Sequence, residues 1–163
     1  MELVRTLSHQ DRESLFGWDE QVFPVEGRNW SWAQPSHHIV YRKEGAATGH
    51  IGFLKSTVET DELLLHVIGV GGVVVRPESQ GKGIPGKMFA FLHEIAPGET
   101  GTNLFTLFCP HRLLSYYAMH GYKEYQWPVR VTQGNELKEI DFGFMTFGKP
   151  EIKGPITTTS EPW

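Results

Sequence analysis

Hydrophobic and polar residues alternate along several short stretches of the chain, and this period of two predicts β-strands. Two such stretches, 37–43 and 49–59, flank a glycine-containing turn and so predict an antiparallel hairpin. Glycines interrupt a longer apolar stretch at 62–75, which predicts a strand with a bulge or bend. The nearly all-apolar stretch 103–109 is typical of a parallel strand that is buried on both faces. Three further strands are expected over residues 2–7, 122–131 and 139–148, the last two paired with each other.

Helices are expected over 9–23, 83–95 and 111–120, because apolar residues recur there at helical spacing. Ser8 is placed to cap the first helix, and Gly121 is placed to end the last one. The resulting order of elements is β-α-β-β-β-α-β-α-β-β. It predicts an α/β (α+β) fold with a mixed, mostly antiparallel sheet and one central parallel βαβ crossover.

The composition is that of an ordinary globular chain, with 163 residues, 39% apolar and 21% charged, and predicts a single domain over residues 1–163. The tail from 148 onward is rich in Gly, Pro and Thr and is expected to be irregular or at a sheet edge, with Trp163 packed. The net charge of -4 and the absence of a basic block argue against a nucleic-acid partner. Cys109 is the single cysteine, which excludes an internal disulfide and a cysteine-based zinc site, and no metal site is predicted.

The first residues, "MELVRTLSHQ", are charged from the second position and contain no long apolar run. They predict neither a signal peptide nor a membrane anchor. We therefore expect a cytoplasmic protein without a membrane partner.

The stretch "VVVRPESQGKGIPGKM", residues 73–88, fits three patterns that hold phosphates on backbone N–H groups at the start of a helix. A triphosphate loop requires Ser or Thr where Met88 stands, to hold magnesium. A dinucleotide loop begins directly after the strand, whereas "RPESQ" intervenes before Gly81. The third pattern, Q-x-x-G-x-G/A, begins at Gln80 and belongs to acyl-CoA-dependent transferases. A glycine-rich turn without a ligand is the remaining alternative.

Two segments, "VVVRPESQGKGI" and "LLSYYAMHGYKEY", resemble the GNAT superfamily of N-acetyltransferases. This resemblance implies the GNAT acyl-CoA N-acyltransferase fold, with acetyl-CoA as cosubstrate and direct transfer of the acetyl group to an amine. Tyr117 falls on the tyrosine that protonates the departing CoA thiolate in these enzymes, which is suitable chemistry because a thiolate leaves poorly without a proton. Pro85 replaces the usual Gly or Ala and removes one N–H donor. The residues expected to bind pantetheine and pyrophosphate are Val73, Val74, Val75, Gln80, Gly81, Lys82, Gly83, Ile84 and Gly86.

Within the superfamily, the chain is most similar to the aminoglycoside 2'-N-acetyltransferases, through "NWSWAQPSHHIVY", "VGGVVVRPE", "DFGFMTF" and the terminal Trp. This resemblance implies a small cationic amine as substrate, an aminoglycoside being one candidate, bound by Trp32 and Trp163, and it implies a homodimer. The family's catalytic glutamate falls on Gly71, and an acidic residue of its acceptor site falls on Asn29. Residues placed to substitute for the base, by position alone, are His38, His50, Glu59, Asp61, Glu62 and His66, and Asp19, Glu20 and Glu26 are expected at the acceptor rim.

Because a glycine stands where that base is expected, a second function remains open. The protein would then be a catalytically degenerate acyl-CoA-binding protein that keeps the loop without the transfer reaction. A third possibility is a nucleotide-binding protein that uses the same glycines.

Overall fold

The computed structural model describes residues 1–19, 22–23 and 29–163. The described strands form one mixed sheet. Its strands are β1 (Glu2–Val4), β2 (His37–Lys43), β3 (Ala46–Glu59), β4 (Leu64–Val75), β5 (Leu104–Cys109), β6 (Lys123–Glu124), β7 (Val129–Gln133), β8 (Glu136–Glu139), β9 (Gly143–Gly148) and β10 (Ile156–Thr158). The main order is β6-β9-β5-β4-β3-β10-β7-β8, and β2 pairs with β3 and with β1.

The centre of the sheet agrees with the sequence prediction. β2, β3 and β4 pair antiparallel in succession, and β4 then pairs parallel with β5 across the connecting helix. β10 and β7 form the other parallel pair among the described strands, and the remaining pairs are antiparallel. The predicted α+β fold with a mostly antiparallel sheet and a central parallel crossover is confirmed.

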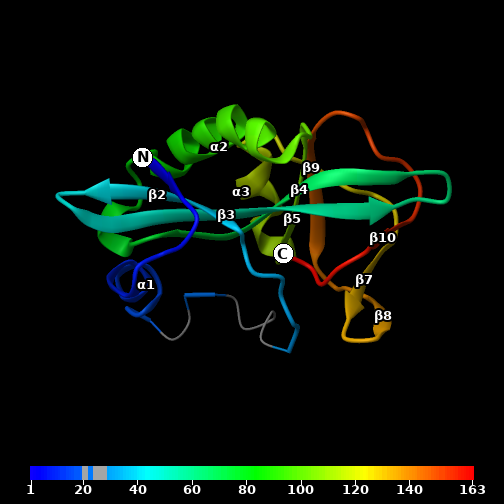
Figure 1. Ribbon diagram of the computed structural model, residues 1–163, viewed down its shortest axis with the longest axis horizontal. Helices are drawn as coiled ribbons and strands as arrows, with labels where there is room; N and C mark the ends of the chain where they lie inside the picture. The colour runs from blue at the N-terminus through cyan, green and yellow to red at the C-terminus, as the bar shows by residue number, and fades with distance from the viewer. Residues whose placement is uncertain (20–21, 24–28) are drawn as a thin grey trace.

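Helices cover the two faces of this sheet unequally (Figure 1). On one face α2 (Ile84–Thr100) and α3 (Leu114–Ala118) enclose the largest core cluster, in which every second residue of the central strands takes part. On the opposite face α1 (His9–Phe16) packs a smaller cluster, and the aromatic side chains around Trp163 form a third. No helix in the described ranges has the length and apolarity needed to cross a lipid bilayer.

The helix boundaries differ from the predicted ones. α1 ends at Phe16 rather than at 23, because Gly17 closes it with an N–H bond to the Glu13 carbonyl; residues 20–21 of the predicted helix lie outside the described part of the chain. α2 continues through Pro97 to Thr100, where Gly101 adopts the left-handed conformation that closes the last turn. A 3₁₀ turn replaces the start of the third predicted helix and leaves only α3, which is five residues long.

The C-terminal third contains the largest errors of the sequence prediction. The two predicted strands after α3 are not simply paired: β6 pairs with β9, whereas β7 pairs with β8 and β10. The hairpin of β7 and β8, which turns at Gly134, was not expected. The tail is not an edge, because β10 lies between β3 and β7 and satisfies the backbone groups of both.

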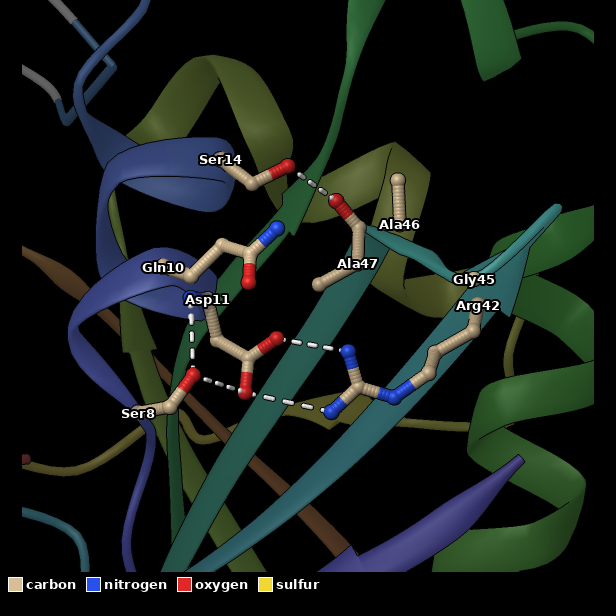
Figure 2. Close-up of a pocket in the computed structure, with 8 residues that line it drawn as sticks. All are labelled: Ser8, Gln10, Asp11, Ser14, Arg42, Gly45, Ala46 and Ala47. Atoms are coloured by element: carbon tan, nitrogen blue, oxygen red, sulfur yellow. Dashed lines mark hydrogen bonds and ion pairs between the residues drawn. The ribbon is translucent and has the colours of Figure 1, made fainter.

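An ion pair fastens α1 to the hairpin of β2 and β3 (Figure 2). Ser8 caps α1, as predicted, by accepting a hydrogen bond from the Asp11 backbone N–H. The Arg42 guanidinium donates two hydrogen bonds to the Asp11 carboxylate, over 2.6 and 3.1 Å, and a third to Glu2. Ser14, on the next turn, donates to the Ala47 carbonyl. The hydrogen bonds from Arg42 lower the pKa of Asp11 from 3.8 to about 2, although burial opposes them.

We expect Asp11→Asn to lower the free energy of unfolding by about 2 kcal/mol at pH 7, because the lowered pKa reflects a preference of the folded state for the ionised form. The wild-type advantage is complete above pH 3.8 and is lost as the pH falls toward 2. Urea unfolding of both proteins at pH 7 and pH 3 measures how the difference between their free energies of unfolding decreases with pH. Glu2→Gln is the matched control: its carboxylate binds the same Arg42 but its side chain is 44% exposed, so a loss of about 0.5 kcal/mol or less is expected.

Candidate active site

β4 and β5 separate at the centre of the sheet. They pair only at Ile68–Val70 of β4 and Phe105–Leu107 of β5, although β4 continues to Val75 and β5 to Cys109. The segment from Gly71 to Val75 keeps β3 as its neighbour on one edge and has no paired strand on the other among the described residues. Its backbone groups on that edge are available to an extended ligand, in the manner of strand addition.

A bulge gives β4 a local change of direction at this separation. Between His50 and Gly52 of β3 the register shifts by one residue, and Gly72 of β4 has a positive φ of 59°. The His50 Nδ1–H donates to the Gly72 carbonyl oxygen over 2.6 Å, and His38 lies 3.0 Å from the other nitrogen of His50. The predicted irregularity at the glycines of this strand is confirmed.

The glycine-rich loop leads from the end of β4 into α2. A 3₁₀ turn, Pro77–Ser79, is followed by Gly81 and Gly83, both with positive φ near 70°, and Gly83 caps the helix. A Cβ added at Gly81, Gly83 or Gly86 would meet no heavy atom within 4 Å, so this surface of the loop is open. No acidic residue lies in the first turn of α2, and the helix N-terminus therefore favours an anion.

Two side chains of this loop are used by the loop itself. Gln80 donates to the Val75 carbonyl over 3.0 Å, and the Lys82 amine donates to the carbonyl of Glu78. Ile84 is buried in the core beneath α2. The Ser79 hydroxyl is buried and has no hydrogen-bond partner among the described residues. These bonds hold the conformation of the loop.

Tyr117 lies on α3 beside the end of β5. Its ring packs edge-on against Phe89, and it shares the core cluster of α2 with Val73, Val75 and Ile84. Burial, assisted by Cys109, raises the pKa of Tyr117 well above its ordinary value of 10.0. Its hydroxyl is therefore protonated at neutral pH and able to serve as a proton donor.

Trp163 lies on the opposite face of the sheet, over the glycines of β4. Its indole N–H donates to the Thr106 carbonyl over 3.1 Å, and the residue is only 4% exposed. A Cβ added at Gly69 would stand 2.5 Å from the indole ring, and one added at Gly71 would stand 2.9 Å from the main-chain carbonyl carbon of Trp163. The tail thus fills the space that a side chain at position 71 would need.

Trp32 belongs to the same aromatic group as Trp163. Its ring meets Phe142 at 5.5 Å and Phe108 at 6.4 Å, and Phe108 in turn contacts Trp163. Ala33, the next residue, donates its N–H to the Pro162 carbonyl over 2.7 Å. The two predicted acceptor residues are therefore brought together, on the face of β4 opposite Tyr117.

A hollow of about 330 Å³ lies beyond the end of β5, next to these aromatic residues. Tyr125 and Trp127, with ring centroids 5.3 Å apart, line it together with Glu124 and Glu139. Phe142 is shared between this hollow and the Trp32 group. Aromatic faces and carboxylates in one hollow suit a cation that carries an apolar or planar part.

The remaining residues that the sequence placed as candidate bases, by position alone, lie in other parts of the structure. Glu59, Asp61, Glu62 and His66 lie at the turn of β3 and β4, at the end of β4 remote from Val75. Asn29 is exposed, and Glu20 and Glu26 lie outside the described residues. Within the described part, no three His, Cys, Asp or Glu side chains gather in a way that would hold a metal ion.

The comparison with known families decides the identity of this fold. The Acetyltransferase (GNAT) domain matches residues 4–129, which include the separated strands, the glycine-rich loop and Tyr117. The chain belongs to the GNAT acetyltransferase family. Members take the acetyl group from acetyl-CoA, so the predicted enzyme class and cosubstrate are confirmed. No curated protein sequence matches the chain.

Solved structures share the GNAT fold at low sequence identity. Escherichia coli ElaA is 15% identical over 78% of both chains, with a TM-score of 0.51. An acyl-CoA N-acyltransferase from Pseudomonas aeruginosa is 15% identical, over 84% of this chain and 85% of its own, with a TM-score of 0.52. YhbS of E. coli, whose structure contains CoA, is 15% identical over 77% of this chain and 68% of its own, with a TM-score of 0.52. None of these similarities singles out the aminoglycoside subfamily.

Two contacts in this GNAT acetyltransferase could not be predicted from the sequence: that of His50 with the bulge of β4, and that of Trp163 with Gly71. His38 and His50 were candidates by position alone, because they lie on neighbouring strands near the glycines. The bond to Gly72 depends on the register of β3 and β4, which alternation of residue types does not specify to one residue.

We expect Gly69→Ala to destabilise the protein by about 1–3 kcal/mol, because the added methyl group collides with the buried indole of Trp163. In a Trp163→Ala background, itself less stable by about 3–5 kcal/mol, the same substitution is expected to cost little. Chemical unfolding of the four proteins of this cycle measures the coupling.

Gly98→Ala on α2 is the matched control, since an added Cβ there meets no atom within 4 Å. It is expected to be neutral or to stabilise by up to about 1 kcal/mol, as alanine favours a helix over glycine. Equal costs of Gly69→Ala in both backgrounds would show that the tail does not pack on β4.

Proposed function

We propose that this protein is an N-acetyltransferase that moves an acetyl group from acetyl-CoA directly to a primary amine of a small cationic acceptor. The observation that carries the proposal is the unpaired edge of β4 from Gly71 to Val75, which leads into an open, acid-free helix N-terminus at α2. An extended pantetheine arm and a pyrophosphate have the shape and charge that these two neighbouring features accept.

In this proposal, the cosubstrate binds along β4 and over the loop. The backbone of Val73, Val74 and Val75 pairs with the amide groups of pantetheine. The pyrophosphate lies over the N–H groups of the loop, with the positive end of α2 beneath it. The residues that contribute there are Gln80, Gly81, Lys82, Gly83, Ile84 and Gly86.

The reaction follows from the groups at the separated strands. The acceptor nitrogen attacks the thioester carbonyl carbon, and the Val73 N–H stabilises the negative charge that develops on the carbonyl oxygen. As the C–S bond breaks, Tyr117 gives its proton to the CoA thiolate. The new ammonium group loses a proton to solvent, and Tyr117 regains one, so that an amide and the free thiol remain.

The acceptor would approach from the face of β4 that carries Trp32 and Trp163. The neighbouring hollow offers Glu124 and Glu139 to a cationic group and Tyr125 to an apolar one. Aminoglycosides, the acceptors of antibiotic-resistance enzymes, meet the charge requirement, and they remain the finer proposal that the sequence resemblance supports. A cytoplasmic homodimer is part of the same proposal, and light scattering after gel filtration tests the dimer.

A degenerate acyl-CoA-binding protein is the second candidate, and one observation favours it. The main chain of Trp163 stands where the side chain of a glutamate at position 71 would begin, so no carboxylate can be supplied from Gly71 in this packing. A positioned base typically accelerates such a reaction by about 100- to 10,000-fold. Acetyl-CoA binding without amine-dependent release of thiol would support this candidate.

The test of both functions combines calorimetry with a thiol assay. Acetyl-CoA is titrated into the protein, and thiol release is then followed with a panel of primary amines that contains aminoglycosides, polyamines and arylalkylamines. Binding with release that depends on one class of amine supports the transferase. Lack of acetyl-CoA binding at millimolar concentration would exclude both functions.

We expect Gly86→Asp to affect stability and binding in opposite directions. A Cβ added at Gly86 meets no atom within 4 Å, and an aspartate in the first turn of α2 stabilises the helix by about 0.3–1 kcal/mol. The same charge repels the pyrophosphate, so the Kd for acetyl-CoA is expected to rise about 10-fold or more. Thermal unfolding and calorimetry measure the two effects. Gly86→Asn, nearly equal in size but uncharged, is the control, and equal Kd values for the two variants would contradict a phosphate site here.

We expect Tyr117→Phe to lower kcat by about 100-fold or more, with the KM for acetyl-CoA nearly unchanged, since only the proton donor is lost. Because burial raises the pKa of Tyr117 above 10.0, the wild-type kcat should show no loss of this donor between pH 7 and pH 10. Steady-state kinetics across that range is the measurement. Tyr116→Phe is the neighbouring control, and an equal loss in that variant would argue against a specific role of Tyr117.

A further inference from the structure

Two buried histidines lie behind the bulge of β4, on the face that α1 covers. His38 of β2 is 7% exposed and His50 of β3 is 2% exposed. The His38 Nδ1 and the His50 Nε2 are 3.0 Å apart, and the His50 Nδ1 is 2.6 Å from the Gly72 carbonyl oxygen. The Phe16 ring packs edge-on against His50 at 5.3 Å, which holds the imidazole in this orientation.

The chemistry of these contacts fixes the proton positions. A carbonyl oxygen only accepts, so the Nδ1 of His50 carries a proton. Burial lowers the pKa of His50 to about 4 and also lowers that of His38, with Arg12 adding to both effects. Both rings are therefore neutral at pH 7, the His50 Nε2 is an acceptor, and the His38 Nδ1–H donates to it. The chain of donors runs in one direction, from His38 through His50 to Gly72.

The Gly72 carbonyl and the Val73 N–H belong to one peptide plane. In a trans peptide these two groups point in opposite directions, so a carbonyl held toward His50 directs the Val73 N–H away from it. The His50 imidazole lies on the α1 side of the sheet, and the opposite side is the one on which Val73 shares a core cluster with Tyr117, next to the edge that β5 leaves unpaired. A hydrogen bond accepted by the carbonyl also polarises the peptide and strengthens its N–H as a donor.

We propose that His50, oriented by His38, is a positioning residue that aims and polarises the Gly72–Val73 peptide so that the Val73 N–H stabilises the thioester oxyanion. This inference rests on the proposed acetyl transfer and adds to it the device that holds the oxyanion donor. Gly72 and Val73 have no partners in the register of β3 and β4, so the strand ladder does not fix the peptide between them and the bond from His50 does.

Two substitutions of His50 are expected to have different effects on kcat. Asparagine places its side-chain N–H near the site of the His50 Nδ1–H and can still donate to Gly72, whereas leucine fills the space without a donor. His50→Leu is expected to lower kcat by about 10- to 100-fold with little change in the Kd for acetyl-CoA, since loss of an oxyanion donor itself costs about 100-fold or more. His50→Asn is expected to recover most of that loss.

Infrared difference spectroscopy with acetyl-CoA carrying ¹³C at the thioester carbonyl reports the hydrogen bond directly. In the wild type and in His50→Asn, the bound carbonyl band should lie below that of the free thioester. In His50→Leu it should move back toward the free value. His37→Leu is the matched control: His37 is also buried on β2 but stacks on Phe53 on the other face, and kcat and band should stay unchanged.

The possible failures are distinct. A wild-type protein that does not bind acetyl-CoA overturns the proposed function and this inference with it. A wild-type protein that binds and transfers, while His50→Leu keeps its kcat and its carbonyl band, overturns the positioning role alone. Equal losses of kcat in His50→Asn and His50→Leu with unshifted bands would show that His50 only supports the fold, which also overturns it.

Discussion

Beyond Val70, the backbone of β4 continues without β5 as its neighbour, and this separation is the constraint on which the site depends. Backbone groups at the centre of a sheet need partners, because an unpaired buried N–H or C=O costs as much as a lost hydrogen bond. Three features of the structure answer this need in different ways. The His50 ring donates to the Gly72 carbonyl, Gln80 donates to the Val75 carbonyl, and in the proposed function the cosubstrate pairs with the remaining edge.

In the proposed site, the two faces of β4 have different roles. Tyr117, Val73 and Val75 share the cluster beneath α2, where burial keeps the tyrosine protonated. The opposite face is flat because Gly69 and Gly71 carry no side chains, and the indole of Trp163 covers them. Glycine at position 71 therefore allows the tail to approach β4, because any larger side chain there would collide with the main chain of Trp163.

The loop after β4 and the core helices were predictable because their determinants are local. Gly81 and Gly83 adopt left-handed conformations that only glycine enters at little cost, so the glycines in the sequence mark where such a loop can form. β5 is apolar except at Thr106, and all six of its residues are buried because both faces of the strand are covered. The ends of α1 and α2 were less predictable. Gly17 ended one helix early, whereas Pro97 did not stop the other, since a proline near a helix end removes few hydrogen bonds.

The sequence by itself determined the order of the central strands, the glycine-rich loop before α2 and the helix that carries Tyr117, because each depends on residues close together in the chain. Only the tertiary structure decided how the C-terminal strands insert, with β10 between β3 and β7. It also decided that His50 donates a hydrogen bond to Gly72 in the bulge and that Trp163 lies against Gly71. These contacts join residues far apart in sequence, and a shift of one residue in strand register would remove them.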